Sequence, residues 1–208
     1  MTLFLDLGCC LGQDIRRLAH DAGINHPDKH LAPVQLFGAE LFADFIAAGY
    51  ELFGDRETLS ARMFQADVLA PDTDADHDDP LAGLYGRVDI IYLGSFLHQF
   101  DACKQRVIVR KIGRLLRADG RGVVFGRHLG VAGRGTGGEF ELKDAGWSLY
   151  RHDEETIRRL FEQEEGTWTV SCELAAYKSK NWEDEGDGKG KPGEDTVQMS
   201  FVAVREAV

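Results

Sequence analysis

The sequence predicts an α/β protein with a doubly wound, mostly parallel seven-stranded sheet, and three observations support this fold class. Short apolar runs of strand length alternate with amphipathic helical stripes over residues 3–126, as in parallel strands joined by helices. Two further strand candidates follow each other directly near the C-terminus, so we expect antiparallel neighbours that close one edge of the sheet. The length of 208 residues suits a single domain with a sizeable core.

Five apolar runs account for the parallel part of the sheet. The first spans residues 3–7 and is expected to form a buried strand that stops at Gly8. The fourth spans residues 88–93 and is as apolar as a central parallel strand should be. The other three are expected at residues 34–39, 62–66 and 122–126.

Helical stripes separate these runs. One begins at Asp14 and stops at Gly23, and another follows the fourth strand and ends near Gly120. After the second strand, four residues share the spacing of a core-facing helix side: Phe42, Phe45, Ile46 and Gly49. Residues 24–33 and 72–79 are expected to be loops, and the second of these is an acidic, solvated turn.

The last third of the sequence is less regular. Residues 130–138 hold five glycines and predict a mobile loop. Asp153 is a suitable N-cap for a short helix whose first turn is acidic. The two edge strands are expected at residues 167–174 and 198–204, and the polar, acidic residues 179–196 between them predict an exposed flexible loop.

The composition excludes several classes of protein. The net charge is −11, so nucleic acid is not expected as a partner. No apolar run is long enough for a membrane span, and the first residues lack the features of a signal peptide. The 4 cysteines include no CxxC pair, which argues against a disulfide framework and against a structural zinc site. We therefore expect a cytoplasmic protein with free thiols and a single domain over residues 1–208.

The most informative segment is the turn after the first strand. Gly8 and Gly12 frame this turn, and a helix starts directly after it. Glycine lets the backbone approach a ligand closely, and a helix N-terminus offers unpaired N–H groups. A dinucleotide-binding loop would have the pattern GxGxxG, whereas here Cys10 stands where the middle glycine would fall.

Three further polar segments follow predicted strands. Glu40 ends the second strand, where a carboxylate can accept hydrogen bonds from both ribose hydroxyls of an adenosine ligand; an ordinary exposed residue at a helix start is the alternative. Asp67 ends the third strand and could accept from an adenine amino group, with Val68 covering the ring. Ser95 and His98 follow the fourth strand. Open α/β sheets bind ligands at this edge, so the coincidence of four such segments is more specific than any one of them.

These segments resemble the class I, Rossmann-like S-adenosylmethionine-dependent methyltransferases. The matching pieces are residues 5–12, 38–40, 65–67, 89–91, 97–100 and 115–120. The resemblance is good over residues 3–128 and looser beyond them. More narrowly, residues 6–14, 49–53 and 150–154 look like a fungal secondary-metabolite subgroup that includes the carboxyl methyltransferases of meroterpenoid pathways.

The resemblance implies that S-adenosylmethionine is the cofactor and that these residues bind it: Asp6, Gly8, Cys9, Gly12, Glu40, Leu41, Ala66, Asp67, Val68 and Ser95. Cys10 departs from the commoner family pattern, which has glycine there, but the narrower subgroup shares this cysteine. The relatives also carry an N-terminal helical segment that roofs the active site. Because this sequence begins at the first strand, we expect those lid helices to be absent.

The implied reaction is methyl transfer to a carboxyl or hydroxyl oxygen of a hydrophobic small molecule. Such a displacement needs alignment and exclusion of water, and a carboxylate acceptor needs no base. A phenol would benefit from one, and His98 is the histidine beside the predicted methyl-donor end; a histidine packed under Phe100 is the alternative. Arg127, His128 and His152 could line the acceptor pocket, with Arg127 pairing with a substrate carboxylate, or could belong to a solvated loop.

Two other functions stay open at this point. A nicotinamide-dependent oxidoreductase would share the topology, but it would need a third glycine in the first turn. A non-catalytic, degenerate methyltransferase-like module would bind the cofactor without turnover. No metal is expected, because His26 and His30 lack a further ligand nearby and the acidic run from Asp72 lacks the glycine and glutamate of a calcium loop. A small-molecule acceptor is the expected partner, and a homodimer is compatible with the sequence.

Overall fold

The structure is a computed structural model that describes residues 1–21, 34–71, 79–117, 121–133, 135, 137–142, 147–177 and 195–206. The strands of the main sheet are β1 (Thr2–Leu7), β2 (Val34–Glu40), β3 (Arg62–Gln65), β4 (Ile90–Gly94), β5 (Gly122–Val131), β8 (Thr167–Ala176) and β9 (Thr196–Glu206). The helices are α1 (Gln13–Asp21), α2 (Ala43–Phe53), α3 (Ala102–Leu115) and α4 (Glu154–Glu162), with 3-10 turns η1 (Ala82–Leu84) and η2 (Leu97–Gln99).

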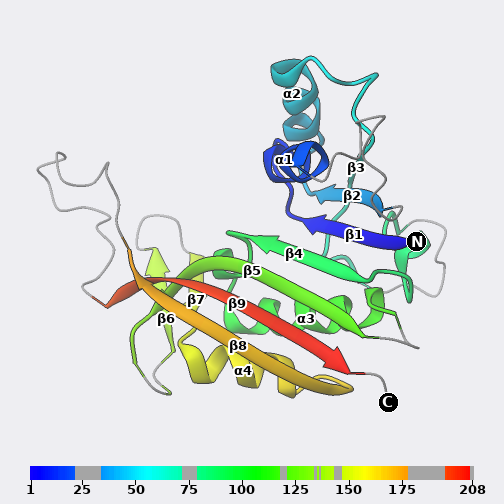
Figure 1. The fold of residues 1–208 in the computed structure, drawn as a ribbon. Coiled ribbons are helices and arrows are strands. Elements are labelled where there is room, and N and C mark those ends of the chain that lie inside the picture. The colour runs from blue at the N-terminus through cyan, green and yellow to red at the C-terminus, as the bar shows by residue number, and fades with distance from the viewer. Residues whose placement is uncertain are drawn as a thin grey trace, which may run out of the picture.

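The seven-stranded sheet has the order β3-β2-β1-β4-β5-β9-β8 (Figure 1). The first five strands are parallel, and β9 runs antiparallel to both of its neighbours, β5 and β8. The order reverses at β1, where β2 pairs on one side and β4 on the other. The predicted doubly wound, mostly parallel sheet with an antiparallel pair at one edge is therefore confirmed.

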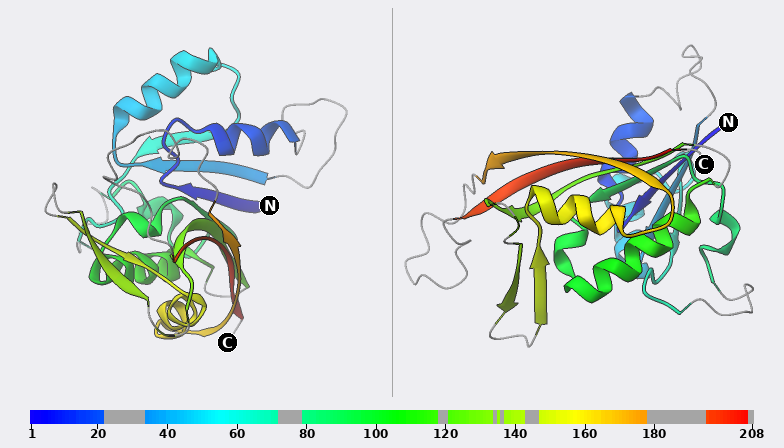
Figure 2. Two further views of the ribbon diagram at one scale, coloured as in Figure 1. Left: turned by 90° about the vertical axis from the view of Figure 1, so that its left-hand side faces the viewer. Right: turned by 90° about the horizontal axis from the view of Figure 1, so that it is seen from below.

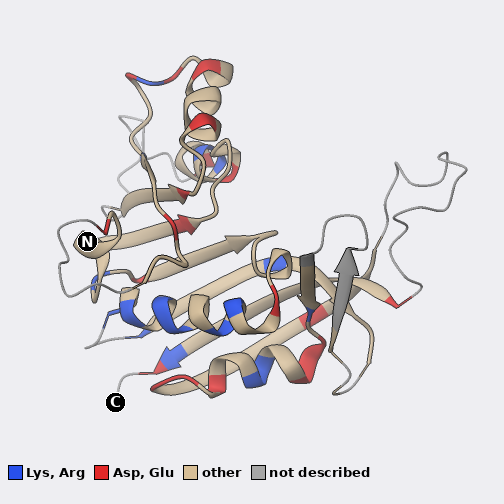
Figure 3. Ribbon diagram, turned by 180° about the vertical axis from the view of Figure 1, so that it is seen from behind, with Lys and Arg blue, Asp and Glu red and all other residues tan. Residues whose placement is uncertain are grey.

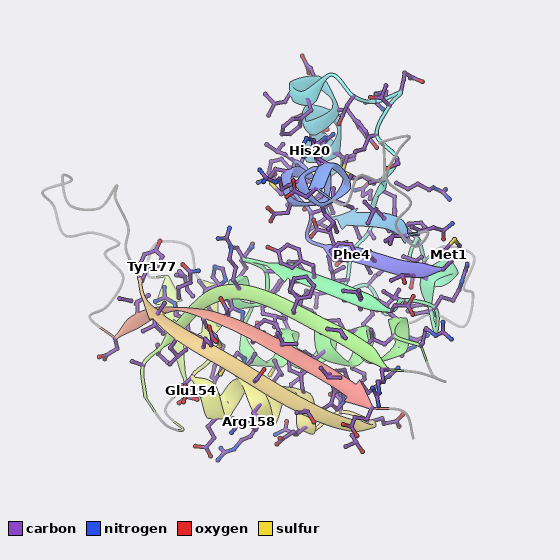
Figure 4. The ribbon with its side chains drawn as sticks, in the orientation of Figure 1. Met1, Phe4, His20, Glu154, Arg158 and Tyr177 are labelled. Carbon is purple, nitrogen blue, oxygen red and sulfur yellow. The ribbon has the colours of Figure 1, made fainter. Side chains whose placement is uncertain are left out.

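Helices cover both faces of the sheet. Figure 2 shows α3 and α4 on one side and α1 on the other. On the α3 side, Ile108 and Phe161 belong to a buried cluster with Leu5 of β1. On the opposite side, Ile15 of α1 packs with Phe4, the next residue along β1. Successive residues of a strand point to opposite faces, so β1 contributes to both cores (Phe4 is labelled in Figure 4).

The main differences from the predicted elements lie around β5. The predicted fifth strand ends at residue 126, but β5 continues to Val131 because it pairs along its length with β9, up to the pair Val131 and Thr196. The predicted glycine loop over 130–138 is shorter than expected, because its first two residues belong to β5 and its last residue begins β6 (Gly138–Leu142). β6 pairs antiparallel with β7 (Trp147–Arg151). Neither of these two strands was predicted. Thr196, the last residue of the predicted loop over 179–196, is the first residue of β9.

The predicted core face of α2 is half correct. Ile46 and Gly49 are buried, but the side chains of Phe42 and Phe45 are 57% and 44% exposed. Figure 1 shows the reason: α2 lies beyond the outer strands of the sheet and has few neighbours on most of its sides. Phe42 and Phe45 instead pack edge to face on each other, with ring centroids 5.7 Å apart.

Several predictions concern residues that the structure does not describe. These are the helix stop at Gly23, the loop over 24–33, the acidic turn over 72–78 and the loop over 179–194. The predicted helix end near Gly120 is wrong, because α3 ends at Leu115 and Leu116 is extended and forms a parallel bridge with Val88. Within the described residues, no helix is long and apolar enough to cross a membrane.

Candidate functional site

The turn after β1 is an unusual piece of backbone. Gly8, Cys10 and Gly12 all have positive φ angles, of 82°, 51° and 75°. The N–H groups of Gly8 and Cys9 both donate to the carbonyl of Ala39, at 2.8 and 3.1 Å, which fastens the turn to the end of β2. The left-handed conformation is easy for glycine and costly for Cys10, so the surroundings of the turn must impose it.

A side-chain network holds the far end of the turn. Gly12 has a φ of 75°, which favours glycine, and an ideal Cβ there would lie 2.4 Å from Sδ of Met63 and 2.8 Å from Nη1 of Arg16, so both long side chains close over this residue. Arg16 donates to the carbonyl of Leu11 at 2.5 Å and makes a two-pronged ion pair with Asp55 at 2.7 and 2.9 Å. The backbone of the turn is therefore braced from α1 and from the loop after α2.

Glu40, at the carboxyl end of β2, is buried and oriented by the backbone. One of its carboxylate oxygens accepts from the N–H of Cys10 at 2.9 Å, and the other accepts from the N–H of Phe42 at 3.1 Å. Each oxygen has a second lone pair, so the same carboxylate can accept two further hydrogen bonds from a ligand. The prediction that Glu40 stands at this edge is confirmed, and its exposure of 8% excludes an ordinary solvated residue at a helix start.

Asp6 makes the turn strongly acidic. It is 3% exposed at the end of β1, and burial, with the nearby charges of Asp14 and Glu40, raises its pKa to about 7. Three carboxyl groups therefore surround one short turn. An ammonium or sulfonium group fits this field, whereas a pyrophosphate, which helix N-termini otherwise bind, would be repelled.

The segment after β3 continues the same edge. The N–H of Ala66 donates to the carbonyl of Glu40 at 2.9 Å, which joins the ends of β2 and β3. Asp67 is exposed, and its carboxylate accepts from the N–H of Leu69 at 2.8 Å. Val68 is buried and Leu41 is 45% exposed, so the edge presents one carboxylate beside apolar surface.

Ser95 directly follows β4 and has the positive φ angle of 54°. Its N–H donates to the carbonyl of Arg127 at 2.7 Å, and its own carbonyl accepts from Nε2 of Gln99 at 2.5 Å. These two bonds hold a conformation that a serine rarely adopts. The residues predicted on β1, β2, β3 and β4 are thus brought together along one edge of the sheet.

His98 lies in η2, close to this edge. Its ring is half-buried, and Nδ1 is buried without a hydrogen-bond partner. Burial, and secondarily the positive charge of Arg151, lower the pKa of His98 to about 4. The imidazole is therefore neutral near pH 7 and can accept a hydrogen bond from a ligand hydroxyl.

His128 and His152 are core residues and do not belong to a solvated loop. They are 4% and 5% exposed, and burial lowers their pKa values to about 3 and about 4. Both N–H bonds of the Gln105 amide are used by the carbonyls of Phe100 and Tyr150, at 2.9 and 2.8 Å. The amide oxygen therefore faces His152, and Nε2 of His152 donates to it at 2.7 Å.

Arg127 points to the other face of the sheet from His128, because the two are neighbours on β5. It is exposed and lines a hollow of about 510 Å³ with Tyr92, Phe125 and Val202. Arg127 and the two buried histidines therefore do not form one acceptor pocket. Among the described residues, no group of three His, Cys, Asp or Glu side chains is placed to hold a metal ion.

The sequence analysis did not predict three structural features of the site. The ring of Phe96 packs on Gly8, and α2 approaches the turn so closely that a Cβ at Gly49 would lie 2.2 Å from the carbonyl oxygen of Leu11. Gln105 is fully buried. Of these three features, only the burial of Gln105 could have been predicted from the sequence, because this polar residue lies in the apolar stripe of α3 with Ile108 and Ile112.

The fold and the acidic, glycine-framed edge define a class I methyltransferase fold. The chain superposes on an S-adenosylmethionine-dependent methyltransferase from Methanosarcina mazei with a TM-score of 0.63 and 10% identity, over 99% of this chain and 93% of that one. At such identity the likeness concerns the fold alone. No family model matches the sequence.

In sequence, the chain groups with fungal methyltransferases. It is 35% identical to the O-methyltransferase phiE of Fungal sp. (strain ATCC 74256) over 81% of this chain and 52% of that protein. It is also 35% identical to the O-methyltransferase atr3 of Stereocaulon alpinum, over 88% of this chain and 50% of that protein. The resemblance drawn from the motifs is confirmed, and the chain spans about half the length of these curated relatives.

Proposed function

We propose that this chain is the S-adenosylmethionine-binding, catalytic domain of an O-methyltransferase. The acceptor would be a carboxyl or hydroxyl oxygen of a hydrophobic small molecule, as expected of enzymes in fungal secondary-metabolite, including meroterpenoid, pathways. The observation that carries the proposal is the turn after β1: glycine-framed backbone surrounded by the carboxyl groups of Asp6, Asp14 and Glu40. This combination suits a cofactor with positive ammonium and sulfonium groups.

Each part of the edge has a role in this proposal. Asp6 and the backbone from Gly8 through Cys9 to Gly12 would hold the methionine part of the cofactor. Glu40, already oriented by two backbone N–H groups, would accept from the ribose hydroxyls. Asp67 would accept from the adenine amino group while Val68 packs against the ring. Leu41, Ala66 and Ser95 would complete the walls.

The cofactor supplies an electrophilic methyl group, so the protein's work is to align the acceptor and to exclude water. His98 would contact the acceptor. Because its pKa is lowered to about 4, it would orient an acceptor hydroxyl as a neutral hydrogen-bond acceptor at pH 7. A carboxylate acceptor is already ionised and requires no proton removal.

The nicotinamide-dependent alternative is less well supported by the same turn. A dinucleotide places its pyrophosphate on the helix N-terminus, where here Asp6 and Asp14 stand close by. Glu40 could accept from the ribose of either cofactor and does not discriminate between them. The degenerate, non-catalytic module differs only in turnover. The single domain over residues 1–208, the cytoplasmic location, the absence of a nucleic-acid partner and homodimer formation are parts of the same proposal; light scattering tests the last of these.

Calorimetric titration with S-adenosylmethionine tests the cofactor site, with NADH as the competing ligand. We expect micromolar binding of S-adenosylmethionine and none of NADH. Glu40→Ala and Asp67→Ala should each weaken binding by about tenfold, because each removes a hydrogen-bonded carboxylate acceptor. Glu51→Ala, an exposed acid on α2, is the matched control and should leave affinity unchanged.

Binding of NADH in place of S-adenosylmethionine would contradict the proposal. Cofactor binding followed by no methyl transfer to any member of a library of aromatic acids and phenols would favour the non-catalytic module. Once an acceptor is known, His98→Ala should reduce turnover without changing the cofactor's Kd. Wild-type turnover in that variant would remove His98 from the mechanism.

A further inference from the structure

The ring of Phe96 lies directly on the glycine turn. An ideal Cβ at Gly8 would stand 2.3 Å from Cδ2 and 2.7 Å from Cε2 of Phe96, so the aromatic ring packs against the backbone of the turn. Phe96 packs against the buried core cluster but is only partly buried itself, so the residue keeps some exposure to solvent. An aromatic side chain thus borders the same backbone that the proposed function assigns to the methionine part of the cofactor.

The position of Phe96 is imposed by its neighbours. Ser95, the preceding residue, is held at a φ of 54° by hydrogen bonds to Arg127 and Gln99. Such a conformation is costly for a serine and persists only where the surrounding structure requires it. Phe100 then supports the ring from the side, edge to face, with centroids 5.1 Å apart.

We propose that Phe96 recognises the positive charge of the sulfonium, and so distinguishes the methyl donor from the demethylated product. The inference rests on the proposed function. The face of an aromatic ring attracts a cation within about 6 Å of its centroid. S-adenosylmethionine carries a sulfonium, whereas S-adenosylhomocysteine carries a neutral thioether, and both carry the same ammonium group. Only the first therefore gains the attraction of the ring.

The consequence concerns exchange of product for donor. Methyl transfer forms a bond between the acceptor oxygen and the methyl carbon with an electron pair of the oxygen, and a hydroxyl acceptor releases its proton to solvent. The sulfur–methyl bond breaks in the same step, and its electron pair remains on sulfur as the thioether's lone pair, so the positive charge on sulfur disappears. The attraction to Phe96 disappears with it. The acidic groups around the turn act in the same direction, but they lie on β1, α1 and β2, whereas Phe96 follows β4, so substitutions at Phe96 separate the two contributions.

The test compares the affinities for S-adenosylmethionine and S-adenosylhomocysteine by calorimetry. Phe96→Leu keeps an apolar side chain and removes the ring, and we expect it to reduce the preference for the charged donor by about fivefold. Phe96→Tyr keeps the ring and should retain the wild-type preference. Phe45→Leu is the matched control, because it removes an exposed ring of α2 that packs on Phe42 and not on Phe96, and it should also retain the preference.

Equal weakening of both ligands in Phe96→Leu would overturn the inference, because it would reduce Phe96 to apolar packing. If that variant fails to show a cooperative thermal transition, trifluorophenylalanine at position 96 replaces it. This residue keeps the shape of the ring and removes the negative charge of its face. Donor affinity must then fall several-fold while product affinity stays constant, and an unchanged ratio overturns the inference. A wild-type chain that binds neither ligand contradicts the proposed function itself, which is a different result.

Discussion

Burial displaces the pKa values of four ionisable side chains, three histidines and Asp6, in opposing directions. The pKa falls to about 4 for His98 and His152 and to about 3 for His128, because a charged imidazole loses its hydration in the interior. Burial and neighbouring carboxylates raise the pKa of Asp6 to about 7. At pH values between the folded and unfolded pKa, the histidines are therefore unprotonated in the folded protein and protonated in the unfolded chain. Asp6 instead keeps its proton in the folded protein and loses it in the unfolded chain.

These displacements predict an acid-sensitive fold. As the pH falls from 6.5, the ordinary histidine pKa, to about 4, unfolding takes up protons on three histidines, and the free energy of unfolding should fall. Asp6 offsets one of these protons, since between pH 3.8 and about 7 its folded form binds the proton that its unfolded form releases. Urea titrations across this pH window measure the slope.

Asp6→Asn is the informative variant for this pH dependence. It removes the opposing proton, so the loss of stability on acidification should become steeper and stability near pH 7 should rise. A wild-type stability that stays flat or increases toward pH 4 would contradict the assignment of neutral, buried histidines.

Single residues differ in how far the sequence reveals them. Glu40 and Asp67 could be predicted because the end of an apolar run also fixes the edge of a parallel sheet. The contact of Phe96 with Gly8 could not, because it depends on a positive φ at a serine, for which no sequence pattern exists. The burial of His128 escaped because its strand was expected to end at residue 126.

At the scale of elements, the close approach of α2 to the turn after β1 is the contact with the sharpest consequence. A Cβ at Gly49 would lie 2.2 Å from the carbonyl oxygen of Leu11, a backbone atom that cannot move independently. Glycine normally weakens a helix by about 1 kcal/mol, so its presence in α2 reflects this packing.

Gly49→Ala should therefore destabilise the protein by about 1–3 kcal/mol through overpacking, and should also weaken cofactor binding because it displaces the turn. Gly113→Ala is the matched control. Gly113 also lies within a helix, α3, but no heavy atom stands within 4 Å of its ideal Cβ, so alanine should stabilise by up to about 1 kcal/mol. Thermal unfolding with and without S-adenosylmethionine measures both effects. Equal effects of the two substitutions would refute the role of close packing.

The pair β6 and β7 shows where element prediction fails. Its strands are short and flanked by glycines, and their placement depends on contacts distant in sequence. The N–H of Tyr150 donates to the carbonyl of Phe100 at 2.9 Å, and buried Gln105 bonds both residues. Local patterns recover strands such as β1 and β4, whose burial shows in a continuous apolar run, and miss those that are placed by such tethers.

At the scale of the whole molecule, charge is distributed unevenly over an acidic protein. Figure 3 shows Lys and Arg gathered along α3, and α3 itself contains no Asp or Glu. Several of these cations have partners, such as Arg110 with Glu164 at 3.6 Å. The glycine turn, in contrast, collects the carboxyl groups of Asp6, Asp14 and Glu40.

The sequence predicted the sheet's class and its antiparallel edge but left the order of the last strands undetermined. A direct connection between β8 and β9 is compatible with either strand lying next to β5, because the hydrophobic pattern only separates buried from exposed faces. The ten residue pairs between β5 and β9 place β9 next to β5, and this long-range pairing cannot be predicted from the local sequence.

The position of β9 between β5 and β8 also constrains the order in which the strands can pair during synthesis of the chain. β8 emerges before β9, yet its described partner in the sheet is β9, which stands between it and β5. Until β9 has been synthesised, β8 can only dock through α4, with its backbone groups unpaired and available to other nascent chains. Pulsed hydrogen exchange during refolding should therefore show β8 amides gaining protection together with those of β9 and never before them. The part of the sheet formed by β9 and β8 is therefore completed last, whereas the edge formed by the ends of β1 to β4 can form as soon as those strands have left the exit tunnel.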